Sequence, residues 1–509
     1  MTTEVYLDAN ATSPALPAAI DAAVDAMGGR FGNPSSSHAA GLRARAMLDA
    51  ARASARTVTG AGEGDIIFTS GATEAIQTAV LSALCALRER QLAGEAGGVD
   101  LLLYGATEHK AVPESLAHWN RILGTGLTVQ ALAVDADGRH DLDQLALLAP
   151  RAALVCTMAA NNETGVVSDL AAIELILTTQ APRALWLVDC VQALGKLPLQ
   201  LAATRIDYAP FSGHKLYAPK GIGLLYVRRG APYTPLMVGG GQEGALRSGT
   251  ENMAGIAAFG AVLAALERGD MLRSPDQLAG LRERLAAALQ AAFPGVVFNA
   301  PFERSLPTTL NFCVPGLSSG ELLNLFDAAG VRVSAGSACS AAKAAPSHVL
   351  VAMGLQDERA GSAVRLSFSP TASDAFIDAA CARIARCGAA MQAYARPATE
   401  PPTIDAGAAA HAVITPRELR AFFASHPEAR LVDVREAFEH AAGELGEWHG
   451  RAIDSMPLSV FTAHLPALLA DAARPVMLFC RSGKALAMLQ RAGHRHAYHL
   501  AGGLALTQD

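Results

Sequence analysis

The chain has 509 residues, a formal net charge of −6 and a pI near 6.2, a length that by itself predicts roughly two to four domains. Apolar residues make up 51% of the chain and aromatic residues 5%, which allows large cores of helices packed around strands. The acidic balance gives no sign of a basic face for nucleic acid. No apolar run reaches the roughly 18–20 residues of a membrane span, and residues 1–10 lack the basic start of a signal peptide. We therefore expect a cytoplasmic protein with no membrane or nucleic-acid partner.

Alternating helical and strand-like segments fill residues 16–265. Short apolar runs separated by helices predict βα units around a mainly parallel sheet that is buried on both faces. The predicted helices are Arg43–Val58 and Thr73–Arg90, and the predicted strands are Asp65–Thr69, Leu101–Tyr104, Ala153–Met158 and Leu185–Val188.

The rest of the chain divides into a second α/β region, a linker and a compact final unit. Residues 266–395 read as helix, strand, loop and helix. Residues 396–412 are rich in Pro, Ala and Gly without periodicity, which is typical of a linker. Residues 413–509 are expected to begin with a helix in which Thr415 is the N-cap and Pro416 the first residue. Two strands should follow, at Arg430–Val434 and Pro475–Phe479.

The eight cysteines are irregularly spaced and include no C-x-x-C pair, so neither a disulfide framework nor a metal site is expected. Two of them, Cys339 and Cys480, lie in unusual contexts that are treated below. The other six lie in apolar or helical surroundings and are expected to be small structural residues; these are Cys85, Cys156, Cys190, Cys313, Cys381 and Cys387.

Four polar pieces suggest a cofactor site. Lys215 follows a Ser-Gly-His turn, and a partly desolvated lysine can form an imine with an aldehyde cofactor. Ser70–Glu74 opens a helix, whose N-terminus can receive phosphate. Asp189 ends an apolar run, where a carboxylate can pair with a pyridinium nitrogen. His109 follows another strand end, where an imidazole can stack on a ring or move protons.

The order and spacing of these pieces resemble the NifS/IscS-like cysteine desulfurases of the class V aminotransferase family, from Tyr6 to about residue 390. The resemblance implies an α/β protein with the type I fold of pyridoxal phosphate (PLP) enzymes. That fold has a large, mainly parallel-sheet domain (about 16–265) and a small α/β domain (about 1–15 and 266–395). The motifs that carry it are Y-L-D-A-N-A-T (6–12), G-N-P-S-S (32–36), S-G-A-T-E (70–74), E-H-K (108–110), N-N-E-T-G (161–165), S-G-H-K (212–215) and R-S-G-T-E-N (247–252).

The resemblance also assigns roles in binding PLP. It implies that Lys215 forms the Schiff base and that His109 stacks on the ring and acts as acid or base. Asp189 would pair with the pyridine nitrogen and Gln192 with the ring oxygen. Thr250 would reach the phosphate of the other subunit, which implies a homodimer. The remaining implied cofactor ligands are Ala72, Thr73, Ser212 and His214 around the phosphate and Asn162 near the ring oxygen.

A second set of residues would bind and act on the substrate, L-cysteine. Small residues surround Cys339, and residues 334–345 contain no apolar anchor, which predicts an exposed, mobile loop. The resemblance makes Cys339 the thiol that accepts sulfur as a persulfide, and Arg365 the group that binds the substrate carboxylate, helped by Asn33 and Asn162. The sequence departs from the family at 368–371, where F-S-P-T follows Arg365.

The final unit resembles a single rhodanese domain, on the basis of residues 431–436, 479–484 and 500–503. Cys480 matches the family's reactive cysteine, and Arg481 and Lys484 would add positive charge. The departures are Ala485 and Leu486 in the expected Cys480 loop, the altered segment 443–450, and the early end of the chain. A degenerate docking domain is the alternative.

Together these features predict a desulfurase that passes sulfur from Cys339 to Cys480 and on to acceptor proteins. Iron–sulfur assembly, tRNA thiolation and thiocofactor pathways all remain open as destinations. One alternative keeps the fold but changes the substrate, as in selenocysteine lyase or another PLP lyase, and Cys339 argues against it. Another is a non-catalytic sulfur carrier or scaffold, and the intact lysine, histidine, aspartate and arginine set argues against that.

Overall fold

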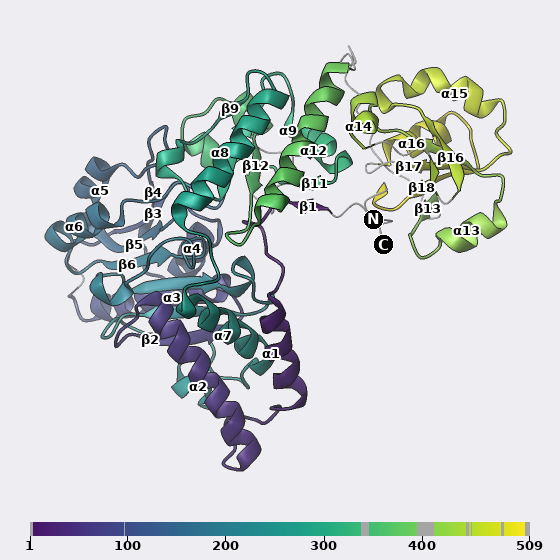
Figure 1. Ribbon diagram of the computed structural model, residues 1–509. Coiled ribbons are helices and arrows are strands. Elements are labelled where there is room, and N and C mark those ends of the chain that lie inside the picture. Colours follow the sequence, from purple (N-terminus) through teal and green to yellow (C-terminus); the bar gives the residue numbers. More distant parts are fainter. Residues whose placement is uncertain are drawn as a thin grey trace.

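The computed structural model describes residues 4–95, 97–336, 346–393, 412–443, 447–448, 450–479 and 483–503. Figure 1 shows a large sheet enclosed by helices, a smaller sheet beside it, and a C-terminal lobe that lies against the smaller sheet's helices. Among these residues, no helix combines the length and the apolar character that a membrane crossing requires.

The large sheet has seven strands in the order β2-β8-β7-β6-β5-β3-β4. Strand β8 runs antiparallel to both of its neighbours, and every other neighbouring pair is parallel. This confirms the mainly parallel sheet. The strands are β2 (Asp65–Thr69), β3 (Leu101–Gly105), β4 (Thr128–Leu132), β5 (Ala152–Met158), β6 (Leu185–Asp189), β7 (Tyr208–Ser212) and β8 (Gly223–Val227).

Helices cover both faces of this sheet. Along β3, Leu101 and Leu103 pack into one core with α2, α6 and α7, whereas Leu102 packs into another with α3 and α4. This alternation follows from the two-residue period of a strand. Small residues let α2 and α7 approach closely, since a Cβ on Gly260 would lie 2.7 Å from the Ala51 Cβ. The helices are α1 (Pro17–Gly28), α2 (Ala39–Thr59), α3 (Ala72–Leu92), α4 (Ala111–Leu123), α5 (Leu142–Leu148), α6 (Leu170–Gln180) and α7 (Met253–Arg268).

The smaller sheet is antiparallel, in the order β12-β10-β9. The N-terminal strand β1 (Val5–Tyr6) pairs in parallel with β11 (Val331–Arg332), and Val5 and Leu7 are buried in this region's core. The start of the chain thus packs against residues more than 300 positions later. The other elements are β9 (Val297–Phe298), β10 (Thr309–Cys313), β12 (Val364–Ser367), α8 (Pro275–Ala292), α9 (Ser319–Ala328), α10 (His348–Ala352), α11 (Asp357–Ser362) and α12 (Asp374–Ala393).

The C-terminal unit, residues 412–503 as described, contains a sheet in the order β13-β18-β17-β14-β16-β15. All of its pairs are parallel except β15 with β16. Helix α14 packs against α9 and α12 of the preceding region. The elements are β13 (Val413–Ile414), β14 (Arg430–Asp433), β15 (Glu447–Trp448), β16 (Arg451–Ser455), β17 (Val476–Phe479), β18 (Ala497–Leu500), α13 (Leu419–Ser425), α14 (Ala437–Ala442), α15 (Phe461–Leu469) and α16 (Lys484–Arg491).

The first helix of this unit begins later than the sequence predicts. Residues 416–418 form a turn, and α13 begins at Leu419 rather than at Pro416. The Glu418 carboxylate accepts hydrogen bonds from the N–H (2.9 Å) and the hydroxyl (2.7 Å) of Thr415, so the Thr415 hydroxyl closes this turn instead of capping a helix. Of the predicted linker, only residue 412 lies within the described residues.

Candidate active site

The polar residues of the candidate site gather at one edge of the large sheet. Strands β2, β3, β5, β6 and β7 all run in the same direction, because only β8 opposes its neighbours. Their carboxyl ends therefore meet at the same edge, where open α/β sheets bind ligands. Gly71 follows β2, His109 follows β3, Asp189 ends β6, and Lys215 follows β7.

Lys215 lies in a turn that the N-terminal segment holds in place. Its Nζ donates hydrogen bonds to the backbone carbonyls of Asn10 (2.8 Å) and Ala11 (2.7 Å). Tyr217, two residues later, has a left-handed φ of 59°, and its N–H donates to the Ser13 hydroxyl at 2.7 Å. The same segment therefore holds both the lysine and an unfavourable backbone conformation beside it.

Two buried carboxyl groups lie near this lysine. Asp189 accepts the Val191 N–H at 2.9 Å. Burial raises the pKa of Asp189 to about 6, and the Val191 N–H and the Lys215 charge partly offset that rise. Glu108 is 1% exposed. Burial and then the Asp189 charge raise the pKa of Glu108 well above its usual range.

His109 presents a neutral imidazole to the same edge. Its Nδ1 accepts the Ala111 N–H at 3.2 Å, which places the proton of a neutral ring on Nε2. Partial burial and the nearby Lys215 charge lower the pKa of His109, with smaller contributions from His348 and Lys110. A neutral imidazole in this position can accept or return a proton.

The start of α3 leaves its first N–H groups without a side-chain cap. Its N-cap is Gly71, which has no side chain to cap the first N–H groups. A Cβ on Gly223 would lie 2.4 Å from the Phe211 carbonyl and 2.8 Å from the Gly71 Cα, so only glycine allows β8 to approach this turn. Ser212 is buried at the end of β7. Burial and the nearby Lys215 and Lys220 charges lower the pKa of His214 to about 4.

These features fit PLP. The uncapped helix terminus suits a phosphate, the buried Asp189 carboxyl suits a pyridine nitrogen, and the Lys215 amine suits an aldehyde. Buried carboxyl groups without a cationic partner are expensive to ionise. A protonated ring nitrogen beside Asp189 would add to the positive charge that Lys215 supplies.

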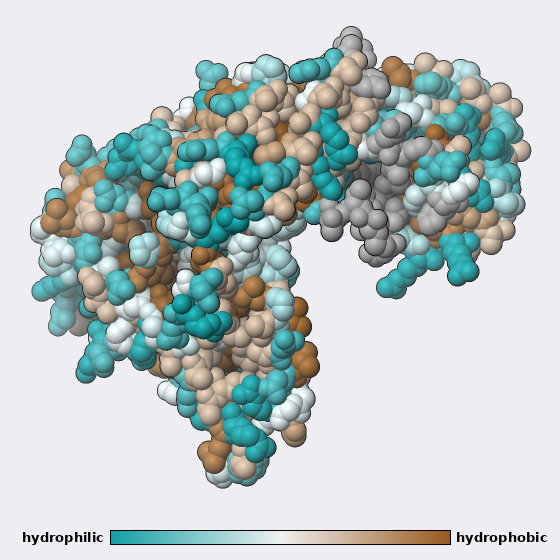
Figure 2. Space-filling view, viewed as in Figure 1, coloured by the Kyte–Doolittle hydropathy of each residue, from teal (hydrophilic) through white to brown (hydrophobic). Residues whose placement is uncertain are grey.

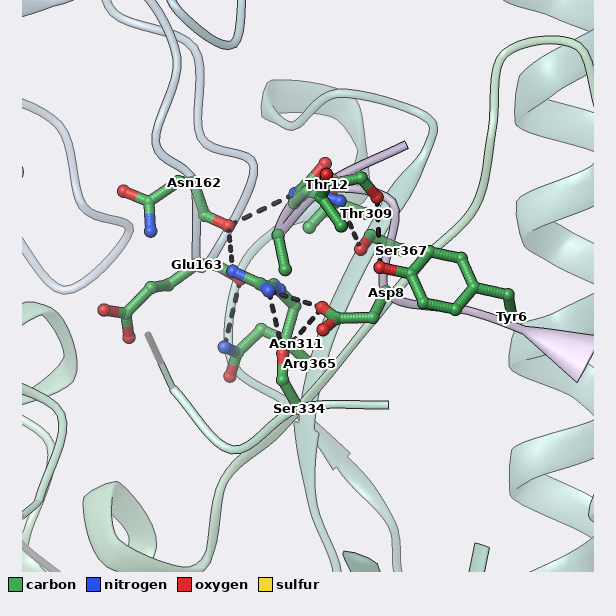
Figure 3. Close-up of polar contacts among 12 residues, drawn as sticks. Tyr6, Asp8, Thr12, Asn162, Glu163, Thr309, Asn311, Ser334, Arg365 and Ser367 are labelled. Carbon is green, nitrogen blue, oxygen red and sulfur yellow. Dashed lines mark hydrogen bonds and ion pairs between the residues drawn. The ribbon is translucent and has the colours of Figure 1, made fainter. Parts of the chain in front are cut away.

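Arg365, in β12, is the centre of a second polar cluster (Figure 3). It is only 1% exposed. Its Nη2 donates to Asp8 Oδ1 (2.6 Å) and to the Ser334 hydroxyl (2.7 Å), and its Nη1 donates to the Asn162 carbonyl (2.8 Å). Its Nε has no hydrogen-bond acceptor within the described part of the chain. The guanidinium is thus fixed by three acceptors and keeps one buried donor for a ligand.

One expectation about the Cys339 segment is wrong at its start. Ser334 is 8% exposed, and its hydroxyl donates to Asp8 Oδ1 at 2.9 Å while it accepts from Arg365. Hydrogen bonds therefore bury Ser334, although the absence of apolar residues around it predicted an exposed position.

The structure brings some of the predicted residues together and leaves others apart. Asn10 links Lys215, Gln192 and the Asn162 carbonyl, since it hydrogen-bonds to all three. The Asn162 side chain points away from Arg365 (Figure 3). The exposed residues among those predicted include His109, Thr73, Asn33 and Thr250. Asn33 accepts the Ser35 N–H at 2.9 Å. Cys339, Cys480 and Arg481 lie outside the described residues.

Asn10 and Glu108 belong to this site and were not singled out from the sequence. Asn10 is fully buried and Glu108 nearly so. Both lie inside motifs that carried the family resemblance, Y-L-D-A-N-A-T and E-H-K. Their place in these motifs was the one sequence feature that could have identified them. Nothing in the local sequence shows that Asn10 contacts a lysine 205 residues away.

Comparisons with known proteins identify the family of this chain. The aminotransferase class-V family model matches residues 5–379. A cysteine desulfurase of Gluconacetobacter diazotrophicus is 39% identical over 376 residues, which is 74% of this chain and 90% of the relative. One from Cereibacter sphaeroides is 38% identical over 377 residues, 74% of this chain and 93% of the relative.

Solved structures give the same result. A NifS-like protein superposes with a TM-score of 0.66 at 31% identity, and covers 75% of this chain and 98% of its own. SspA in complex with cysteine has a TM-score of 0.61 at 27% identity, and covers 73% of this chain and all of its own. The chain has the type I fold of PLP-dependent enzymes and belongs to the NifS-like cysteine desulfurases of the aminotransferase class-V family.

Proposed function

We propose that this protein converts L-cysteine to L-alanine and retains the sulfur as a persulfide on Cys339. The observation that carries this proposal is the joint placement of Lys215, Asp189 and His109 at one sheet edge, linked through Asn10 to the fixed Arg365. The relatives that match three quarters of the chain are named cysteine desulfurases.

The chain's own residues have distinct tasks in this reaction. PLP on Lys215 would supply an electron sink for the substrate's α-carbon. Arg365 would bind the substrate carboxylate through its unpartnered Nε. The freed Lys215 amine would take the α-proton, and the neutral His109 would move a proton at the substrate.

The sulfur step leaves the protein with one additional sulfur atom. The Cys339 thiolate would attack the substrate sulfur, and the carbon–sulfur bond of the substrate breaks. The three-carbon product takes up a proton and leaves as alanine. The net change is one cysteine and one protein thiol converted into one alanine and one protein persulfide.

We also propose that the protein is a homodimer. Four apolar side chains along α1 and just beyond it are exposed: Ile20 (51%), Val24 (59%), Met27 (63%) and Phe31 (71%). The spacing of Ile20, Val24 and Met27 places these three on one face of α1, and Phe31 follows the helix. Figure 2 shows apolar atoms along the α1 side of the projecting lower part of the molecule. A second copy would cover this face, and its exposed Thr250 would complete the phosphate site.

For residues 413–509 we propose a rhodanese-like domain that receives sulfur on Cys480. Support comes from its five parallel strands and from the position of Cys480 between the end of β17 and the start of α16. A strand–loop–helix junction supplies backbone N–H groups and a positive helix end, which lower a thiol pKa. Acceptor proteins for iron–sulfur, tRNA-thiolation or thiocofactor synthesis would then take the sulfur.

The test uses purified, PLP-loaded full-length protein supplied with cysteine. We expect a lysine-bound cofactor band, release of alanine, and persulfide on Cys339. Cys339→Ser should keep the band and lose persulfide formation, while Cys313→Ser, at a buried cysteine, serves as the matched control. Unchanged alanine release by the Cys339 variant would sink the desulfurase proposal and favour a lyase. Absence of the band would favour the non-catalytic carrier.

The relay is tested separately. Cys480→Ser should retain alanine release and persulfide on Cys339 but deliver sulfur more slowly to an added thiol acceptor protein. A variant that delivers sulfur at the normal rate would remove Cys480 from the pathway. The C-terminal unit would then be a docking domain.

A further inference from the structure

A second lysine, Lys196, lies within the candidate site, after the end of β6. Its Nζ donates to Gln192 Oε1 at 2.5 Å and to Asn10 Oδ1 at 3.2 Å. Gln192 is 3% exposed and Asn10 is fully buried. Lys196 therefore reaches the same asparagine that accepts from Lys215, one contact away from the proposed cofactor linkage.

These contacts determine the orientation of the Gln192 amide. A lysine ammonium can only donate, so the Gln192 atom that it contacts must be the carbonyl oxygen. The amide nitrogen then faces the opposite way, and one of its N–H groups donates to the Asn10 carbonyl at 3.2 Å. Gln192 Nε2 has no other acceptor among the described residues, so its second N–H is available to a ligand.

The charges around Lys196 favour an anionic neighbour. Both of its acceptors are neutral, and it has no carboxylate within ion-pair distance among the described residues. Burial, followed by the nearby Lys215 and Arg365 charges, lowers the pKa of Lys196 to about 7. Lys196 and Lys215 both donate to Asn10, and the Arg365 charge also acts on Lys196.

We propose that Lys196 is a positioning residue that turns the Gln192 amide so that its remaining N–H donates to the ring oxygen of PLP. The inference rests on the proposed function and deepens it. An N–H donor held in this orientation binds an ionised ligand oxygen more strongly than a protonated one. The site would therefore select the ionised form of the ring oxygen, and Lys196 would act on the cofactor through Gln192 rather than by contact.

The test is a double-mutant cycle on PLP-loaded full-length protein, with Lys196→Met, Gln192→Met and the double variant. The readout is the midpoint pH at which the absorption band of the lysine-bound cofactor changes. A hydrogen bond to a charged group is worth about 1.5–3 kcal/mol, so we expect Lys196→Met to raise that midpoint by about one pH unit. In the Gln192→Met background the same substitution should shift it by less than about 0.3 unit.

Two controls separate the inference from folding and from the function itself. Lys196→Arg retains N–H donors and should restore at least half of the shift. Thermal unfolding of each cofactor-free variant shows whether it is folded. Equal shifts by Lys196→Met in both backgrounds, or no shift in either, would overturn the role through Gln192. A wild-type protein without the band would instead overturn the proposed cofactor, which is a distinguishable result.

Discussion

At the scale of single residues, the buried Asp189 carboxylate lowers the stability of the cofactor-free protein but serves the proposed function. Without a ligand, its buried carboxyl has a pKa of about 6 instead of 3.8. The folded state therefore binds this proton more tightly than the unfolded state. Below pH 4 this carboxyl makes its full contribution to the free energy of unfolding. As the pH rises through 6, that contribution is lost, by up to about 3 kcal/mol.

Asp189→Asn should therefore have opposite effects on stability and turnover. We expect the cofactor-free variant to gain up to about 3 kcal/mol of unfolding free energy at pH 7 and little at pH 4, as measured by urea unfolding. With PLP, alanine release should fall by about 100-fold or more, since the protonated ring loses its counter-charge. An identical pH dependence of stability in both proteins would contradict this reasoning.

The role of Arg365 depends on the shape of its guanidinium group and not only on its charge. Its guanidinium reaches Asp8, Ser334 and the Asn162 carbonyl at once, which a lysine cannot do. Arg365→Lys should raise the KM for cysteine by about 10–100-fold, because a charge-assisted hydrogen bond is worth about 1.5–3 kcal/mol. Arg359→Lys is the matched control, because Arg359 contacts Asn299 and the Phe298 carbonyl instead. Equal effects of both substitutions would point to general destabilisation.

At the scale of elements, the turn between β2 and α3 depends on Gly223 of the neighbouring strand β8. Gly223→Ala would place a Cβ 2.4 Å from the Phe211 carbonyl and 2.8 Å from the Gly71 Cα. Overpacking of this kind costs about 1–3 kcal/mol, and displacement of the turn should increase the loss of PLP on dialysis. Gly280→Ala in α8 is the control, since its Cβ would meet nothing within 4 Å. That change should stabilise the protein by about 0.5–1 kcal/mol with PLP retention unchanged.

The sequence predicts an element well where the residues that determine it are neighbours in the chain. Strand β2 has the predicted bounds, Asp65–Thr69, because apolar runs between helices report burial on both faces. The antiparallel direction of β8 could not be predicted, since apolar composition carries no information about strand direction. The contacts of Asn10 were equally hidden, because they join positions that only the folded chain brings together.

At the scale of the whole molecule, α14 fixes the C-terminal unit against the region that supplies Arg365. Phe438 and Ala442 belong to the same buried cluster as Leu325 and Phe326 of α9. A Cβ on Gly443 would lie 1.8 Å from the Ala328 carbonyl, so the two backbones approach closely. The two regions therefore share a core, and the position of the C-terminal unit is part of the fold rather than a matter of linker length.

Glu439 makes this docking dependent on pH. It is 6% exposed, and burial raises its pKa from 4.5 to about 7, with the Glu436 N–H, the Arg435 charge and the Asn324 side chain opposing that rise. A carboxyl whose pKa is raised by folding favours the folded state at low pH. Its contribution is complete below about pH 4.5 and declines as the pH rises through 7, by about 3 kcal/mol in total.

Glu439→Gln should remove this decline, because a neutral amide fits the same site at every pH. We expect thermal unfolding of the variant to occur at higher temperature than that of wild type at pH 8 and at a similar temperature at pH 5. The exposed Glu428→Gln substitution should change neither value. Phe438→Ala, which empties the same interface, should cost about 3 kcal/mol or more at both pH values. A Glu439→Gln variant that follows the wild-type pH profile would show that another group controls docking.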